Sequence, residues 1–136
     1  MRKYKLIEHT ADMGLVAYGN SIPEAFANAA YGLFSIITDL RTVRAIEFRS
    51  IEISENDSET LLFEWLNYLL YVFDVEMIIF KKFEMKYFNG KKLIALCQGE
   101  KYDPLRHRLR RGVKAATYHM MQIDTEHNRV RVIFDV

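Results

Sequence analysis

A short connection near the start of the chain carries residues that could do chemistry. It reads Glu8-His9-Thr10-Ala11-Asp12 and lies between two apolar runs, so it holds two carboxylates, an imidazole and a hydroxyl. A turn between two strands needs only the backbone chemistry of Gly, Asn or Pro. The composition of this connection therefore indicates a role beyond joining two strands.

A further carboxylate lies at the other end of the chain. Asp135 ends a predicted strand, and Val136 after it adds its α-carboxylate. Asp12 and Asp135 both occupy strand ends, where a short carboxylate can project from a sheet without entering the core. Such oxygen donors repel one another unless a cation or a basic residue lies between them. Oxygen-only ligation favours Ca²⁺ or Mg²⁺ over Zn²⁺, and Ca²⁺ takes about 6–8 oxygens, so water or a second macromolecule must complete the shell.

Each candidate also has a purely structural interpretation. Asp12 can be a turn residue that hydrogen-bonds local amides and Asp135 an exposed charge, and spacing alone favours this interpretation. His9 can be a metal ligand or a general base, or it can hydrogen-bond the connection into shape, since hard cations seldom choose imidazole. Lys114 can neutralise the carboxylates, touch an acidic or phosphate group of a partner, or be an exposed strand-end lysine. Lys114, His9 and Glu8 are the candidate partner contacts.

Two predicted strand pairs determine where the acidic connection and the last two residues lie. Apolar and β-favouring residues over 3–8 and 13–18 predict a hairpin with the acidic connection at its tip. Two later runs, 115–123 and 129–135, are separated by a short polar connection and should pair antiparallel. That pairing puts Asp135 and Val136 opposite residues 114–117.

Two amphipathic helices supply the predicted core. Ser21 and Glu24 form a capping box for the first helix, which ends near Thr38 and Asp39. The second helix starts at a cap in residues 56–58. Its apolar positions recur with the helical period and are Leu61, Leu62, Trp65, Leu66, Leu69, Leu70 and Phe73.

Three more strands complete the prediction. Residues 43–54 alternate with a change of parity, which suggests a bulge. Residues 78–88 and 91–100 are joined by Asn89-Gly90, a sequence typical of a type I′ turn. The predicted fold is α+β: a two-layer sandwich in which two main helices pack on one face of a mixed, largely antiparallel sheet. It forms one domain over residues 1–136.

The composition excludes several function classes. Nineteen Lys and Arg against 18 Asp and Glu give a net charge of +1, so bulk charge recruits neither nucleic acid nor a membrane. Cys97 is the only cysteine, which excludes an internal disulfide and a cysteine-based zinc site. No signal-peptide pattern and no apolar stretch near the ~20 residues of a membrane span is present, so we expect a soluble, cytoplasmic protein. The basic run from Arg106 to Arg111 could meet RNA backbone or be a solvated loop.

Several short motifs follow one another along the chain. They are Glu8-His9-Thr10-Ala11-Asp12, Ala17-Tyr18-Gly19, Glu24-Ala25-Phe26, Thr38-Asp39, Trp65-Leu66-Asn67, Leu69-Leu70-Tyr71, Gly99-Glu100, Val113-Lys114-Ala115, Thr117-Tyr118-His119 and Val132-Ile133-Phe134-Asp135-Val136. With these motifs the chain resembles the archease family over essentially its whole length. The basic segment 108–112 departs from similar proteins, which usually carry a less basic segment there.

The resemblance implies a small α+β protein that assists an RtcB-type RNA ligase in tRNA splicing and RNA repair. Such proteins promote guanylylation of the ligase histidine and its repeated turnover. The family's calcium ligands fall here on Asp12, Asp135 and Val136, where Val136 contributes main-chain oxygen. We expect Ca²⁺, with Mg²⁺ or Mn²⁺ as alternatives, no catalytic residue, and contact with RNA only through the ligase.

Two other functions remain open from the residues. Asp12, Asp135 and His9 could form the metal site of a phosphodiesterase that acts on RNA. The protein could instead be a general chaperone or interaction module whose acidic residues only brace the fold. The absence of a glycine-rich phosphate loop, a GxSxG motif and a paired cysteine and histidine favours a non-catalytic protein.

Overall fold

The computed structural model describes residues 2–136, which form seven strands and two long helices. Four strands make one antiparallel sheet, in the order β1 (Tyr4–Glu8), β2 (Asp12–Tyr18), β7 (Arg129–Asp135) and β6 (Ala115–Asp124). Three make a second antiparallel sheet, in the order β3 (Glu47–Ser54), β5 (Lys92–Lys101) and β4 (Ile78–Phe88). The helices are α1 (Ile22–Ile37) and α2 (Ser58–Glu76), and a single 3₁₀ turn, η1, spans Leu40–Thr42.

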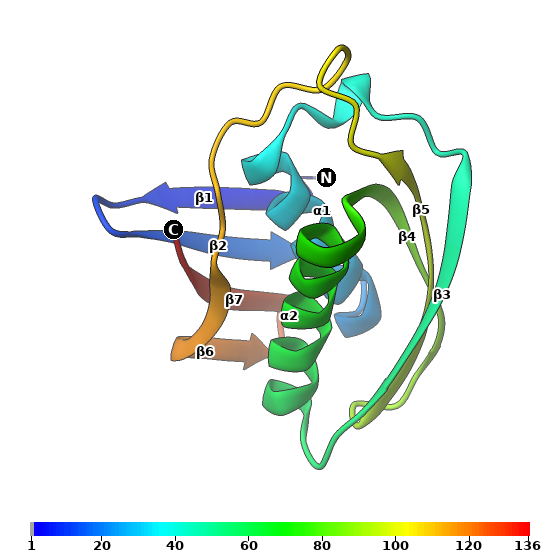
Figure 1. Ribbon diagram of the computed structural model, residues 1–136. Coiled ribbons are helices and arrows are strands. Elements are labelled where there is room, and N and C mark those ends of the chain that lie inside the picture. Colours follow the sequence, from blue (N-terminus) through cyan, green and yellow to red (C-terminus); the bar gives the residue numbers. More distant parts are fainter. Residues whose placement is uncertain (1) are drawn as a thin grey trace.

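The two helices lie between the two sheets (Figure 1). α1 contacts β2 and β7 of the first sheet and β4 of the second, whereas α2 contacts β6 on one side and β3 to β5 on the other. This arrangement confirms the predicted α+β class, its two main helices and its largely antiparallel pairing. It differs from the prediction in that the strands divide into two sheets. The reason lies in α1, whose buried residues run around most of its circumference and require apolar cover on two sides.

The cap predicted for α1 is confirmed, with one change of partner. Ser21 Oγ accepts a hydrogen bond from the Glu24 amide at 3.3 Å. The Glu24 carboxylate reaches back to the amide of Asn20, at 3.2 Å, rather than to that of Ser21. Both contacts satisfy amides that have no partner inside the helix.

The apolar face of α2 forms the centre of the core. Asp57 accepts from the Thr60 amide at 2.8 Å and caps the helix, as predicted. Trp65 is fully buried, and its Nε1 donates to the Phe26 carbonyl of α1 at 3.1 Å. Burial of each large apolar side chain stabilises the fold by roughly 1.5–3 kcal/mol before the loss of conformational entropy is counted. No helix among residues 2–136 is long and apolar enough to cross a membrane.

The bulge predicted in the strand after α1 is wrong. β3 pairs with β5 in an unbroken register from Glu47 opposite Gly99 to Ser54 opposite Lys92. The change of apolar parity has another cause: Ile46 and Phe48 are 57% and 65% exposed, whereas Ile51 is buried on the other face. The apolar residues of this segment therefore lie on both faces of the sheet, one exposed and one buried in the core.

The hairpin between β4 and β5 is confirmed, but the type I′ turn is wrong. Gly90 has φ of 90°, whereas Asn89 is not among the non-glycine residues with positive φ. The Asn89 side chain instead accepts from the amides of Lys91 and Lys92, at 2.9 and 2.7 Å. A side chain that bonds amides two and three residues on replaces part of the backbone turn.

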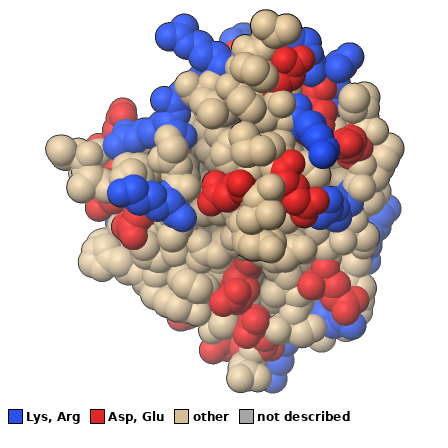
Figure 2. All heavy atoms as spheres, in the orientation of Figure 1, with Lys and Arg blue, Asp and Glu red and all other residues tan. Residues whose placement is uncertain are grey.

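A long connection without a helix runs from the second sheet back to the first. Residues 102–114, called the strap below, run from the end of β5 to the start of β6 and cross the top of the molecule in Figure 1. Lys and Arg are interspersed with Asp and Glu over the face shown in Figure 2, in keeping with the net charge of +1.

Candidate metal and partner site

Asp12 and Asp135 lie directly opposite each other on the neighbouring strands β2 and β7. Alternate residues of β2 face the helices, since Met13, Leu15 and Ala17 are buried in the core. Asp12 has the other parity and so faces away from the helices, and its partner Asp135 shares this outer face. The structure thus brings together the two carboxylates that were predicted to share a cation.

The Asp12 carboxylate has a buried oxygen without a partner. Oδ1 is buried and makes no hydrogen bond to any described residue. An unpaired buried carboxylate oxygen is costly, and a like charge directly opposite adds to that cost. A cation at this oxygen removes both costs, whereas a neutral donor from a partner molecule removes only the first. The residues present therefore fit a hard cation.

The other predicted ligand and one predicted contact lie beside the acidic pair. Val136 follows Asp135, is half-buried, and packs its side chain against the core, so its main-chain oxygen is the group available to a ligand. Lys114 donates its amide to the Asp135 carbonyl at 2.8 Å, and its side chain is exposed. Ala115 pairs with Asp135, which confirms the predicted register of the last two strands.

The tip of the β1–β2 hairpin completes this corner of the molecule. The His9 amide donates to the Asp12 carbonyl at 3.2 Å, and the His9 side chain is exposed. Glu8 is exposed and forms an ion pair with Arg111 of the strap at 2.9 Å. This ion pair was not predicted from the sequence, although both the connection and the basic run stand out in it.

The side chains alone do not make a complete metal site. Nowhere in residues 2–136 do three or more His, Cys, Asp or Glu side chains gather in a way that could hold a metal. Asp12 and Asp135 supply two side chains, so a further protein ligand would come from the main chain or from an uncharged side chain. Burial raises the pKa of the Cys97 thiol to about 12, which keeps this residue out of metal chemistry.

A buried carboxylate anchors the start of the strap. Glu100 is 3% exposed and accepts from the Arg44 amide at 2.8 Å, from the Arg106 guanidinium, and from His107 Nε2 at 2.9 Å. His107 Nδ1 accepts from the Asp103 amide, so Nε2 carries the donated proton. Burial alone raises the pKa of Glu100, but these hydrogen bonds outweigh it and hold the pKa at about 2. This cluster was not predicted from the sequence, where its only signal is a Glu at the end of an apolar strand.

The later part of the strap is tied to α1. Thr38 Oγ1 donates to the Arg108 carbonyl at 2.7 Å, and the Arg110 amide donates to the Ile37 carbonyl at 2.7 Å. The basic run is thus an ordered segment held at its backbone. This segment places Arg111 next to Glu8 and Lys114 next to Asp135.

The family relationship follows from comparison with known proteins. The model of the archease protein family matches residues 4–136. The chain belongs to the archease family. Protein archease of Sulfurisphaera tokodaii is 41% identical over 140 residues, which cover 100% of this chain and 99% of that protein. Protein archease of Methanothermobacter thermautotrophicus is 39% identical and is covered completely, as is this chain.

Solved structures agree with the archease fold. The solution structure of protein 1598 of Methanobacterium thermoautotrophicum is 39% identical, superposes with a TM-score of 0.85 and covers 100% of both chains. The crystal structure of a Thermotoga maritima archease, described as a possible chaperone, has a TM-score of 0.60 at 21% identity and covers 100% of this chain and 98% of that chain. This second likeness concerns the fold.

Proposed function

We propose that this archease is a calcium-binding, non-catalytic accessory protein that activates an RtcB-type RNA ligase. It would promote guanylylation of the ligase and its multiple turnover in tRNA splicing and RNA repair in the cytoplasm. The observation that carries the proposal is the pairing of Asp12 with Asp135, with an unpartnered buried oxygen on Asp12. Membership of the archease family supports the choice of partner.

Asp12, Asp135 and a main-chain oxygen of Val136 would hold Ca²⁺, or Mg²⁺ or Mn²⁺ in its place. The bound cation supplies positive charge that lets these oxygens lie together and that attracts an anionic group of the partner. Because so few donors come from this chain, a carboxylate or phosphate of the partner would help to complete the shell. Binding of cation and partner would then be mutually dependent.

Exposed side chains at the same corner would contact the partner. The main chain of Lys114 bonds Asp135, and its exposed ammonium can meet an acidic side chain or a phosphate. Glu8 and His9 lie at the hairpin tip on the other side of Asp12. None of them is placed as a nucleophile or as an acid-base pair, so the chemistry would belong to the ligase.

A ligase turnover assay tests this proposal. With limiting nucleotide cofactor, the cognate ligase should guanylylate itself repeatedly only when this protein is present. Asp12→Asn should lower the stimulated rate by about tenfold or more, and Lys114→Ala should lower it to a smaller extent. Asp74→Asn is the matched control, because Asp74 is an exposed carboxylate on α2 that forms no ion pair among the described residues. Full-rate, multiple-turnover guanylylation by the ligase alone would falsify the proposal.

Two further measurements separate the alternatives. Calorimetric titration of Ca²⁺ should show weak binding to the protein alone and tighter binding when the ligase is added. Incubation of the purified protein with RNA and Mg²⁺ or Mn²⁺ should leave the RNA intact, whereas cleavage that Asp12→Asn abolishes would identify a phosphodiesterase. A general chaperone would instead protect unrelated clients from aggregation without any special effect on the ligase.

A further inference from the structure

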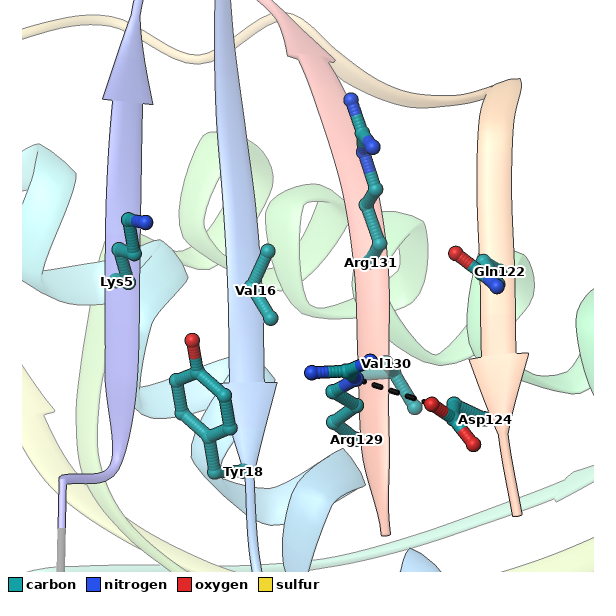
Figure 3. A pocket seen from close by; sticks show the side chains of 8 residues that line it. All are labelled: Lys5, Val16, Tyr18, Gln122, Asp124, Arg129, Val130 and Arg131. Atoms are coloured by element: carbon teal, nitrogen blue, oxygen red, sulfur yellow. Dashed lines mark hydrogen bonds and ion pairs between the residues drawn. The ribbon is translucent and has the colours of Figure 1, made fainter. Parts of the chain in front are cut away.

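A polar groove lies on the same outer sheet face as the acidic pair, further along the strands. It encloses a volume of about 250 Å³ and is lined by Lys5, Val16, Tyr18, Gln122, Asp124, Arg129, Val130 and Arg131 (Figure 3). We propose that this groove binds single-stranded RNA, with backbone phosphate held by Lys5 and Arg131 and a base stacked on Tyr18.

Strand pairing aligns the lining residues in two rows. Lys5 lies opposite Val16 on the next strand, and Val16 lies opposite Arg131. Gln122 lies opposite Arg131 on the far strand, so this row spans all four strands. Tyr18 lies opposite Arg129, which in turn lies opposite Asp124, and these residues form the second row. The groove is therefore built by the sheet itself rather than by a loop.

The positive charge of the groove is only partly neutralised. Asp124 pairs with Arg129 at 3.0 Å and with His127 at 2.9 Å, and these contacts lower its pKa against the opposing effect of burial. Within the described residues, neither Lys5 nor Arg131 has a carboxylate at ion-pair distance. Two cations of one row, on the strands that flank Val16, are thus free for an anionic ligand, which is the requirement for holding a phosphate.

The remaining lining groups favour RNA over an acidic peptide. Figure 3 shows the Tyr18 ring between β1 and β2, the Arg129 guanidinium over β7 and the Gln122 amide on β6 at the far side of the groove. An aromatic ring on an open sheet face can stack a base, and an amide can hydrogen-bond base edges. An acidic peptide needs the cations but makes no use of the ring.

The architecture of this sheet fits the same ligand. Four antiparallel strands carry the groove on their outer face while α1 and α2 cover the inner face. An antiparallel four-stranded sheet of this kind, with an aromatic on its open face, is a known platform for single-stranded RNA. The groove and Asp12 are four residues apart along β2, or about 13 Å at the rise of a strand. In Figure 3 the Arg131 side chain extends along β7 toward the strand's end, where Asp135 lies. An RNA strand in the groove could therefore run toward the acidic corner.

RNA binding in this groove contrasts with the expectation that RNA is contacted only through the ligase. It does not depend on that ligase, because the surface would bind RNA whether or not the accessory role is correct. The test therefore uses the purified full chain and no other protein.

Fluorescence anisotropy with a labelled, unstructured RNA 10-mer is the decisive measurement. The double variant Lys5→Gln/Arg131→Gln should weaken binding about tenfold or more at low salt. It should also reduce the slope of log affinity against log salt by about 1.4, because each single-strand phosphate contact contributes about 0.7. Tyr18→Leu should weaken binding about fivefold or more through lost stacking, whereas Tyr18→Phe keeps the ring and should bind like the wild type.

The matched control removes the same charge from the other sheet. Lys82→Gln/Lys91→Gln changes two exposed lysines of the second sheet and its turn, and it should bind RNA like the wild type. Unchanged thermal midpoints would show that each variant is folded. The proposal is overturned if the wild type does not bind the RNA, if the control loses as much affinity as the groove variant, or if polyglutamate displaces the RNA as well as unlabelled RNA does.

Discussion

The side chain of Asn67 on α2 makes two hydrogen bonds to the backbone of Ala116 on β6. Asn67 Oδ1 accepts from the Ala116 amide at 2.8 Å, and Asn67 Nδ2 donates to the Ala116 carbonyl at 3.2 Å. The amide side chain thus behaves like the backbone of an additional strand. It fixes the start of β6, two residues after Lys114 and one after the partner of Asp135.

Asn67→Ala should destabilise the fold and loosen this corner. The change leaves the Ala116 N–H and C=O without their partner, which costs about 1–3 kcal/mol. Urea unfolding should show the loss, and amide exchange should quicken at Ala116 more than in β5. Asn56→Ala is the control, because Asn56 is exposed and ahead of the α2 cap. Equal stability of the two variants would contradict the structural role of Asn67.

Asp12→Asn should stabilise the metal-free protein. The substitution removes one of two like charges that lie directly opposite on neighbouring strands, an arrangement that destabilises the sheet. In EDTA the thermal midpoint of the variant should therefore be above that of the wild type. Added Ca²⁺ should raise the midpoint of the wild type only. A lower midpoint in EDTA would instead show that Asp12 braces the fold.

Local signals made much of this structure predictable. The caps at Ser21 and Asp57, the hairpin around Gly90 and the period of the α2 leucines all depend on residues a few positions apart. The placement of Asp135 beside residues 114–117 followed from one short connection between two strands. The resemblance to archeases, rather than strand spacing, indicated that Asp12 lies at the same site as Asp135 and Val136.

Contacts between distant residues could not be predicted in the same way. Glu100 bonds Arg44 across 56 positions, and Arg111 pairs with Glu8 across 103. The division of the strands into two sheets depends on how α1 is covered on both sides, and the hydrophobic pattern of single strands does not report it. The groove was missed for the same reason, since its rows combine four strands whose order is set by the whole fold.

Trp65→Ala should cost about 3–5 kcal/mol of unfolding free energy, since it opens a cavity at the centre of the core. The change also removes the hydrogen bond that joins α2 to the Phe26 carbonyl. Trp65→Phe retains most of the apolar volume and should cost less than half as much. Both can be measured by urea unfolding followed by circular dichroism. If the protein tolerates Trp65→Ala at under about 1 kcal/mol, the packing of α1 on α2 is not as described.

The Glu100 cluster should make the protein acid-sensitive. Its folded-state pKa of about 2 lies below the ordinary value of 4.5, so folding favours the charged form. The stability this gives is fully present above about pH 4.5 and is lost as the pH falls toward 2. The shift corresponds to the order of 3 kcal/mol over that interval. Wild-type protein should therefore lose stability steeply between pH 5 and pH 2 in urea titrations.

Glu100→Gln isolates this contribution. The variant should be less stable than the wild type at pH 7, because Arg106 and the Arg44 amide lose a charged acceptor in a buried place. Its stability should also fall less between pH 5 and pH 2, so the two curves should converge in acid. Glu8→Gln is the control, since its ion pair with Arg111 is exposed and should change stability by less than about 1 kcal/mol at either pH. Parallel curves for wild type and Glu100→Gln would show that another carboxylate controls acid unfolding.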